Sequence, residues 1–258
     1  MTMEAAMLGA SVLDRGPDAP PLYRQLIREL RALCDSLGSG ERFPSERELT
    51  EHYDVSRVTV QQALAALVRS GLLRREQGRG TFVAEPKVER PLSRMNSFSE
   101  DMRQKGLAPS SRLVSHSTMV ANLRLARALS VEQGAEVVLI ERLMFADDAP
   151  MAVHQTYIRG DRCGDLVRRH LDDLRAGRSL YDLLENQGGL RLTEADETVE
   201  ATEATGEIAG LLGIDIGDPV LWIVRRTWLD DGVPLEVSEM TYRGDRYRLT
   251  LRSQRDPH

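Results

Sequence analysis

The sequence predicts a two-domain α+β protein, in which a small helical domain with a β-hairpin precedes a domain built on an antiparallel sheet. Residues 43–83 contain two capped helical segments and a Gly-tipped hairpin. Residues 85–94 (EPKVERPLSR) contain two prolines and no periodicity, which is typical of a linker. Strand-like runs with helical inserts follow. A length of 258 residues with 41% hydrophobic content is ample for two such domains.

Two short helices are expected at the start of this region. Ser45 is a favourable N-cap, and Glu48, three positions later, completes a capping box. After a turn at residues 54–55, Ser56 caps the second helix, which is expected to stop at Gly71.

The second helix is amphipathic. At 100° per residue, Val60, Leu64 and Leu67 share the face that points to the core. The opposite arc and its flank carry Arg57, Val58, Thr59, Gln61 and Gln62. Arginine can bond the guanine edge and glutamine the adenine edge, so this arc suits a reader of the DNA major groove.

A hairpin follows, with strands expected at residues 72–75 and 81–83. Its glycines permit positive φ and a close approach to a phosphate or the minor groove. Two capped helices followed at once by a basic hairpin predict a DNA-binding winged helix-turn-helix. An ordinary helical hairpin with solvated charges is the alternative.

Charge is unevenly distributed along the chain. Residues 21–84 contain ten arginines and eight acidic residues, which gives a net charge of +2. Because the whole chain has a net charge of −6, the residues outside this range have a net charge of −8. A mildly basic DNA-binding region in an otherwise acidic chain fits sequence-specific binding better than non-specific electrostatic binding to nucleic acid.

From PLYRQL at residues 21–26 to GRGTFV at residues 78–83, the sequence resembles the GntR family of bacterial transcription regulators. The resemblance implies a double-stranded DNA partner and a wing that reaches the minor groove. Gln61 stands where the family most often has arginine, so a shifted operator sequence is expected. The DNA-binding residues expected from the helix arc and the resemblance together are Arg47, Ser56, Arg57, Thr59, Gln61, Gln62, Arg79 and Gly80.

Two further hairpins are expected in the second domain. The first joins strands at 137–145 and 151–158, and the second joins strands at 220–229 and 235–242. Strands flanked by helices without regular βαβ alternation indicate an antiparallel sheet. The other expected elements are helices at 123–129, 179–186 and 209–212, an alternating run at 193–204 and a last strand at 247–252.

Polar side chains interrupt these strands. Arg142 lies in an otherwise apolar row, where an internal salt bridge and a ligand contact are equally good explanations. Glu236 and Tyr242 share a strand face, where solvation and packing are the simpler roles. Ser179 is expected to cap a helix, and His154 to be a structural residue.

From NSFSED at residues 96–101 to YRGDRY at residues 242–247, the sequence also resembles the ligand-sensing UTRA domain of the HutC subfamily. In sugar-phosphate-sensing relatives, the positions of Ser97, Arg142, Ser179 and Tyr181 hold the anionic group, and those of Glu236 and Tyr242 hold the sugar. Here Met144 replaces a second arginine and His154 replaces an acid. The loss of a guanidinium disfavours a doubly charged phosphate and favours a carboxylate, or a neutral or aromatic metabolite. The expected effector-binding residues are therefore Ser97, Arg142, Met144, His154, Ser179, Tyr181, Glu236 and Tyr242.

The expected domains are a disordered lead at 1–19, the winged helix-turn-helix at 20–84, a linker at 85–94 and the UTRA domain at 95–252. The lead lacks the basic cluster of a signal peptide. Cys34 and Cys163 alone form no disulfide framework or zinc motif, so we expect a cytoplasmic protein without a metal or cofactor.

Together these features predict a metabolite-responsive repressor that binds an inverted-repeat operator as a homodimer, away from any membrane. Because the UTRA fold resembles that of chorismate lyase, a lyase-like enzyme with a DNA-binding appendage is the alternative. An all-helical effector domain is disfavoured by the alternating runs. An aminotransferase domain does not fit the remaining length, nor the positions of Lys87 and Lys105, the only lysines.

Overall fold

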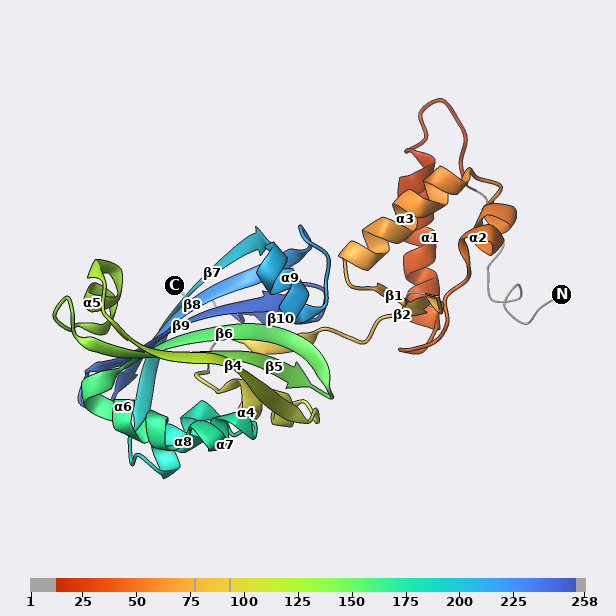
Figure 1. Ribbon diagram of the computed structural model, residues 1–258. Helices are drawn as coiled ribbons and strands as arrows, with labels where there is room; N and C mark the ends of the chain where they lie inside the picture. The colour runs from red at the N-terminus through yellow and green to blue at the C-terminus, as the bar shows by residue number, and fades with distance from the viewer. Residues whose placement is uncertain (1–12, 77, 93, 254–258) are drawn as a thin grey trace. The chain divides into compact units, whose positions relative to one another are not determined.

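The computed structural model describes residues 13–76, 78–92 and 94–253 (Figure 1). The chain divides into two compact units, Met1–Lys87 and Val88–His258, and each is described by itself. Most of the expected disordered lead, residues 1–12, lies outside the described residues.

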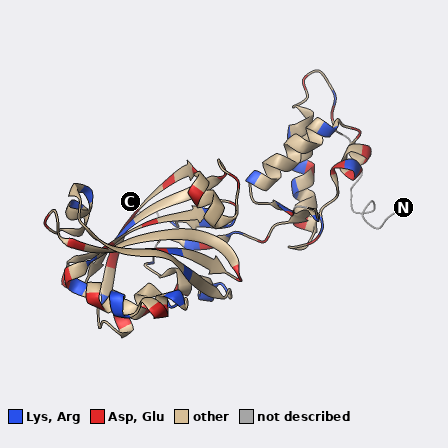
Figure 2. Cartoon of the chain, in the orientation of Figure 1, with Lys and Arg blue, Asp and Glu red and all other residues tan. Residues whose placement is uncertain are grey.

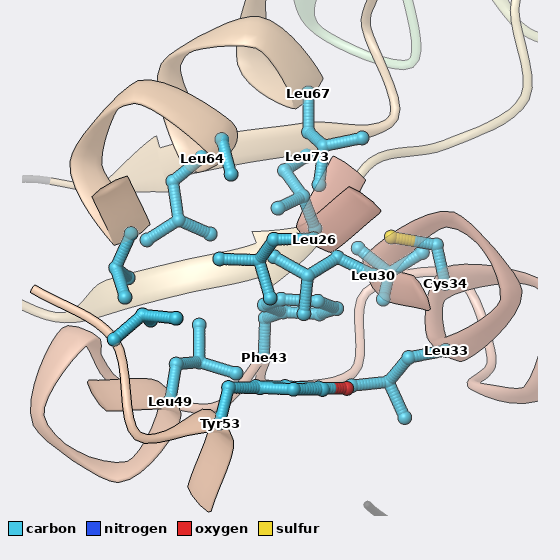
Figure 3. Close-up of a cluster of buried hydrophobic side chains, with 14 of the residues drawn as sticks. Leu26, Leu30, Leu33, Cys34, Phe43, Leu49, Tyr53, Leu64, Leu67 and Leu73 are labelled. Atoms are coloured by element: carbon cyan, nitrogen blue, oxygen red, sulfur yellow. The ribbon is translucent and has the colours of Figure 1, made fainter. Parts of the chain in front are cut away.

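Three helices and a hairpin form the N-terminal unit. Its core is closed by leucines from all three helices together with Phe43 and Tyr53 (Figure 3). Helix α1 was not among the expected elements, and it buries Leu26 and Leu30 completely. The elements are α1 Leu22–Ser36, α2 Glu46–Tyr53, α3 Arg57–Arg69, β1 Leu73–Glu76 and the antiparallel β2 Gly80–Val83.

Helices α2 and α3 begin as predicted. The Ser45 N–H donates to Glu48 Oε2 at 2.8 Å and the Glu48 N–H donates to Ser45 Oγ at 3.3 Å, which completes the capping box. The Ser56 hydroxyl accepts from the Thr59 N–H at 3.2 Å. Asp54, with φ 49°, ends α2 in the left-handed region and allows the short turn between the helices.

The described part of the lead is ordered, contrary to expectation. Leu13 is buried in the core of the N-terminal unit. The Gln25 side chain, itself buried, donates to the Asp14 carbonyl at 2.8 Å and to the Pro20 carbonyl at 2.7 Å. Because a buried amide needs such partners, Gln25 fixes this segment against α1.

A six-stranded antiparallel sheet in the order β4-β5-β6-β9-β8-β7 forms the C-terminal unit (Figure 1). A separate pair, β3 and β10, is parallel. The strands are β3 Val88–Pro91, β4 Pro109–Val120, β5 Glu136–Ala146, β6 Ala149–Arg159, β7 Leu192–Glu203, β8 Pro219–Leu229, β9 Pro234–Arg243 and β10 Tyr247–Thr250.

Helices cover the two faces of this sheet differently. One face carries α4, α6, α7 and α8, which pack on buried residues such as Ile140, Ile158 and Met240. On the other face, α5 packs against Val137 and α9 against Val153. The helices are α4 Phe98–Gln104, α5 Leu123–Leu129, α6 Gly160–Arg169, α7 Leu171–Arg175, α8 Leu180–Asn186 and α9 Gly206–Leu212.

Several elements of the C-terminal unit differ from the expectation, which did not include helices α4, α6 and α7. The expected linker, residues 85–94, contains β3, which pairs with β10 despite its proline because Pro91 ends the strand. Strand β4 was missed because it is an edge strand with little apolar alternation, including Ser111, Ser115 and Ser117.

Candidate functional site

The outer face of α3 is open to solvent, as its periodicity predicts. Val60 and Leu67 are fully buried, whereas the Arg57 side chain is 76% exposed and Val58 is 61% exposed. Gln61 and Gln62 are also exposed. The arc that was predicted to reach base edges is therefore accessible.

A single carboxylate on α2 binds side chains from α3 and from the hairpin. Glu46, the first residue of α2, accepts from Arg57 Nε at 3.2 Å, Gln61 Nε2 at 3.0 Å and Arg75 Nη2 at 3.4 Å. The Gln61 hydrogen bond is the main cause of the lowered pKa of Glu46, ahead of the charge of Arg57. Glu46 thus orients two residues of the reading arc, a role that sequence reasoning missed.

The remaining predicted DNA-binding residues surround this arc. Arg47 is exposed beside Glu51 at 3.4 Å, and the Arg79 guanidinium lies 5.6 Å from the centre of the Phe82 ring. Gly80, at φ 121°, occupies backbone space that favours glycine. Figure 2 colours basic residues blue at both ends of α3 and on α2. Ser56 and Thr59 are occupied with each other at the helix start, 2.9 Å apart.

All eight predicted effector-binding residues line one pocket in the C-terminal unit. Arg142, His154, Glu236 and Tyr242 come from adjacent strands β5, β6 and β9, whose register places them on the same sheet face as Met144. The other three come from the starts of two helices. Ser97 precedes α4, and Ser179 precedes α8 beside Tyr181.

The charges in this pocket are buried. Arg142 is 6% exposed, its Nε lacks a hydrogen-bond partner, and no carboxylate of the described residues lies within ion-pair distance of it. Burial lowers the pKa of Arg142, against the attraction of Glu236. The internal salt bridge considered for Arg142 is therefore absent from the described part of the chain.

Glu236 is buried and only partly satisfied, contrary to the simple expectation of a solvated carboxylate. Its Oε1 accepts from the Tyr181 hydroxyl at 2.7 Å and from the Thr227 hydroxyl at 3.1 Å. Its Oε2 lacks a hydrogen-bond partner among the described residues. The pocket thus offers one unsatisfied cationic and one unsatisfied anionic group.

His154 and the two serines already have partners. His154 Nε2 lies 3.1 Å from the Tyr242 hydroxyl, and burial, reinforced by Arg142, holds the pKa of His154 well below its usual range. A neutral imidazole adds no anion-binding charge. The hydroxyls of Ser97 and Ser179 accept the N–H bonds of their helix starts.

Sequence reasoning missed Arg225, which lines the pocket from β8 and is 5% exposed. Its Nε donates to Glu197 Oε1 at 2.5 Å, and its Nη1 donates to the Asn96 carbonyl at 3.1 Å. The signal was available, because Arg225 interrupts the row of Ile223, Thr227 and Leu229 as Arg142 interrupts its own. Thr156 and Ser238, also missed, hydrogen bond to each other at 3.0 Å in the pocket floor.

The pocket contains little free space. The free space inside it is about 30 Å³, enough for roughly two waters. Metabolite sites have volumes of roughly 300–1,000 Å³. A ligand must therefore displace some of the lining side chains.

The described residues give little sign of other chemistry. They contain no group of three His, Cys, Asp or Glu side chains placed to hold a metal. Burial raises the pKa of Cys34 to about 11 and that of Cys163 to about 12. Over the same part of the chain, every helix is too short or too polar to cross a bilayer.

Two family models match the chain. Residues 22–83 match the model for bacterial regulatory proteins of the gntR family, and residues 104–248 match that for the UTRA domain. The first match covers the helices and hairpin of the N-terminal unit, and the second covers the large sheet.

Individual regulators are similar over most of their length. The HTH-type transcriptional repressor NagR of Bacillus subtilis is 38% identical, over 88% of this chain and 92% of that protein. The histidine utilization repressor of Pseudomonas putida is 30% identical, over 96% and 98%. The crystal structure of PhnF from Mycobacterium smegmatis aligns with a TM-score of 0.63 and 32% identity, over 89% and 99%.

Proposed function

The chain belongs to the GntR family of bacterial transcription regulators with a UTRA domain of HutC type, and from this premise we propose that it is a homodimeric repressor released from an inverted-repeat operator by a small metabolite. Its relatives named above are transcription regulators, which favours this function over the lyase-like enzyme.

The open polar arc of α3 carries the DNA-binding part of the proposal. Arg57 and Gln61 project from the first two turns of the helix and are held side by side through Glu46. Entry of this end of α3 into the major groove would place both side chains against base edges. Arg79 and Gly80 at the hairpin tip would then contact the backbone or minor groove.

A homodimer would supply the second reading helix. One helix contacts too few bases for useful specificity, and a twofold dimer reads an inverted repeat. The sheet face that carries α5 and α9 leaves Tyr157, Trp222 and Val224 only partly buried. We propose that a second copy of the chain covers these side chains.

The homodimer can be tested by the solution mass of the full chain. Sedimentation equilibrium should give about twice the monomer mass of 28.9 kDa. Trp222→Lys would place a charge in the proposed interface and should shift the mass toward the monomer. A monomeric wild-type chain at micromolar concentration would contradict this part of the proposal.

The effector is proposed to be a monoanion, such as a carboxylate, that also donates hydrogen bonds. Arg142 is a buried cation without a paired carboxylate, so an anionic ligand would give it the partner it lacks. Glu236 Oε2 would accept from a hydroxyl or ammonium group of the same ligand. Neither Met144 nor the neutral His154 adds charge for a second negative group.

Two measurements on the full chain test this function. DNase footprinting on the DNA upstream of its own gene should show a protected inverted repeat that survives excess random duplex. Binding no tighter than to random duplex would refute the repressor function. Thermal shift with carboxylates, amino acids and sugar phosphates should identify the effector, since a ligand at 100 times its Kd stabilises by about 2.7 kcal/mol.

A further inference from the structure

A line of four buried charges connects the pocket to β3. Arg225 Nε and Arg90 Nη2 both donate to the same oxygen, Glu197 Oε1, at 2.5 and 2.8 Å. On its other side, Arg90 Nε lies 3.3 Å from Asp101 Oδ2. The four side chains are between 3% and 12% exposed. We refer to Arg225, Glu197, Arg90 and Asp101 as the charge relay.

The far end of the charge relay lies in the strand that receives the DNA-binding unit. Ala84 is held in the N-terminal unit, because its N–H donates to Leu72 O at 2.9 Å. Residues 85–87 then lead directly to β3. Three residues span at most about 11 Å. Because this connection is short, we expect a displacement of β3 to move the N-terminal unit as well.

Strand β3 is attached to the large sheet both by packing and by Arg90, since Val88 packs in one apolar cluster with Tyr242 and Tyr247 and Arg90 adds an ion pair. Among the described residues, the backbone of β3 pairs with β10 alone, through bonds such as Val88 N–H to Arg246 O at 2.8 Å and Leu92 N–H to Thr250 O at 2.9 Å. A two-stranded ribbon is marginally stable by itself. The Arg90 guanidinium, by contrast, reaches Glu197 on β7 of the main sheet.

The near end of the charge relay is part of the pocket wall. Arg225 Nη1 donates to the Tyr181 hydroxyl at 3.4 Å, and Tyr181 also donates to Glu236. An anion that enters the pocket therefore meets two guanidiniums, Arg142 and Arg225. Of these two, only Arg225 is already paired with a carboxylate, Glu197, from which an anion could draw it away.

We propose that Arg225 senses the effector and that Glu197 and Arg90 pass its response to β3, an inference that rests on the proposed function. The charge relay contains two cations and two carboxylates, which balance. An effector anion that takes Arg225 as its counter-ion leaves Arg90 as the sole cation between Glu197 and Asp101. Arg90 then redistributes between two buried carboxylates, and β3 moves with it.

The test uses the full chain without effector, because Arg225→Gln removes the same positive charge that an effector would draw away. Hydrogen exchange of the β3 and β10 amides should become several-fold faster. Affinity for the footprinted operator should fall by at least about 5-fold, the lower end of typical allosteric couplings.

Arg162→Gln is the control. Arg162 on α6 also pairs with one carboxylate, Asp231 Oδ2 at 2.6 Å, but it belongs neither to the pocket lining nor to the charge relay. It should leave both the exchange of β3 and operator affinity as in the wild type. If Arg225→Gln behaves like Arg162→Gln, the charge relay does not carry the signal.

A second variant covers the case in which Arg225→Gln fails to unfold cooperatively. Glu197→Gln keeps an oxygen acceptor between the two arginines and removes the charge, and it should also speed exchange in β3 and weaken operator binding. Wild-type exchange and affinity in Glu197→Gln would overturn the inference. Failure of the wild-type chain to protect any inverted repeat would instead refute the proposed function.

Discussion

Two buried guanidiniums, those of Arg142 and Arg225, line the same pocket, and of the two only Arg225 has an ion-pair partner. Replacing Arg142 by methionine should stabilise the effector-free protein. The residue is 6% exposed and its Nε is unsatisfied. A buried ion costs several kcal/mol even after relaxation, whereas a buried methionine side chain contributes about 1.5–3 kcal/mol.

The expected net effect is smaller than the sum of these two contributions, since Glu236 partly offsets the charge of Arg142. We expect Arg142→Met to raise the free energy of unfolding by roughly 1–3 kcal/mol, at about 2–4 °C of Tm for each kcal/mol in a domain of this size. Arg225→Met should act in the opposite direction, by roughly 3–5 kcal/mol, because it leaves Glu197 with fewer partners.

Calorimetry of the full chain would measure both variants against the wild type, with attention to the transition of the C-terminal unit. The effector found by thermal shift should stabilise the wild type and leave Arg142→Met unchanged. If Arg142→Met lowers Tm as much as Arg225→Met does, Arg142 has a structural role and the anion site is elsewhere.

Three further predictions concern other parts of the molecule. Arg57→Ala should weaken operator binding by about 1–3 kcal/mol per half-site in a fluorescence titration, with binding to random duplex much less affected; equal losses on both DNAs would contradict base reading. The pKa of folded His154 lies well below its unfolded value near 6.5, so its contribution to stability is complete above that pH and falls by about 1 kcal/mol between pH 6.5 and 5.5. His154→Gln should lose that part of the pH dependence of Tm, and an unchanged profile would show that His154 does not cause it. Because burial raises the pKa of Cys34 to about 11 and of Cys163 to about 12, both thiols should react with a thiol reagent at pH 8 only at the rate of unfolding, and rapid labelling of the native chain would refute their burial.

The N-terminal unit was largely predictable because its signals are local. A capping pair three residues apart and an apolar face at helical spacing both lie within one element, so Ser45, Glu48 and Leu64 could be placed without knowledge of the fold. Glu46 could not be assigned in this way. Its importance comes from Arg75, which is 29 residues away in sequence.

The pocket shows the corresponding limit for strands. Alternation identified Arg142 as anomalous within β5 but left its partner undetermined, since the facing residues come from β6, β9 and β8. The family resemblance, rather than periodicity, brought Ser97 and Tyr181 to the same site. Neither approach could find Arg90, because its segment reads as a proline-containing linker and pairs with a strand more than 150 residues later.

Leu13 has a practical consequence for work with this protein. Its side chain fills part of the core that Tyr53 and Leu30 also line. A shortened chain that begins at residue 20, the expected start of the DNA-binding domain, would leave a cavity beneath α1 and remove two hydrogen bonds between Gln25 and Asp14. Affinity tags and deletions are therefore safer upstream of residue 13, and weak DNA binding by a trimmed protein would reflect a loosened reading head rather than a missing contact.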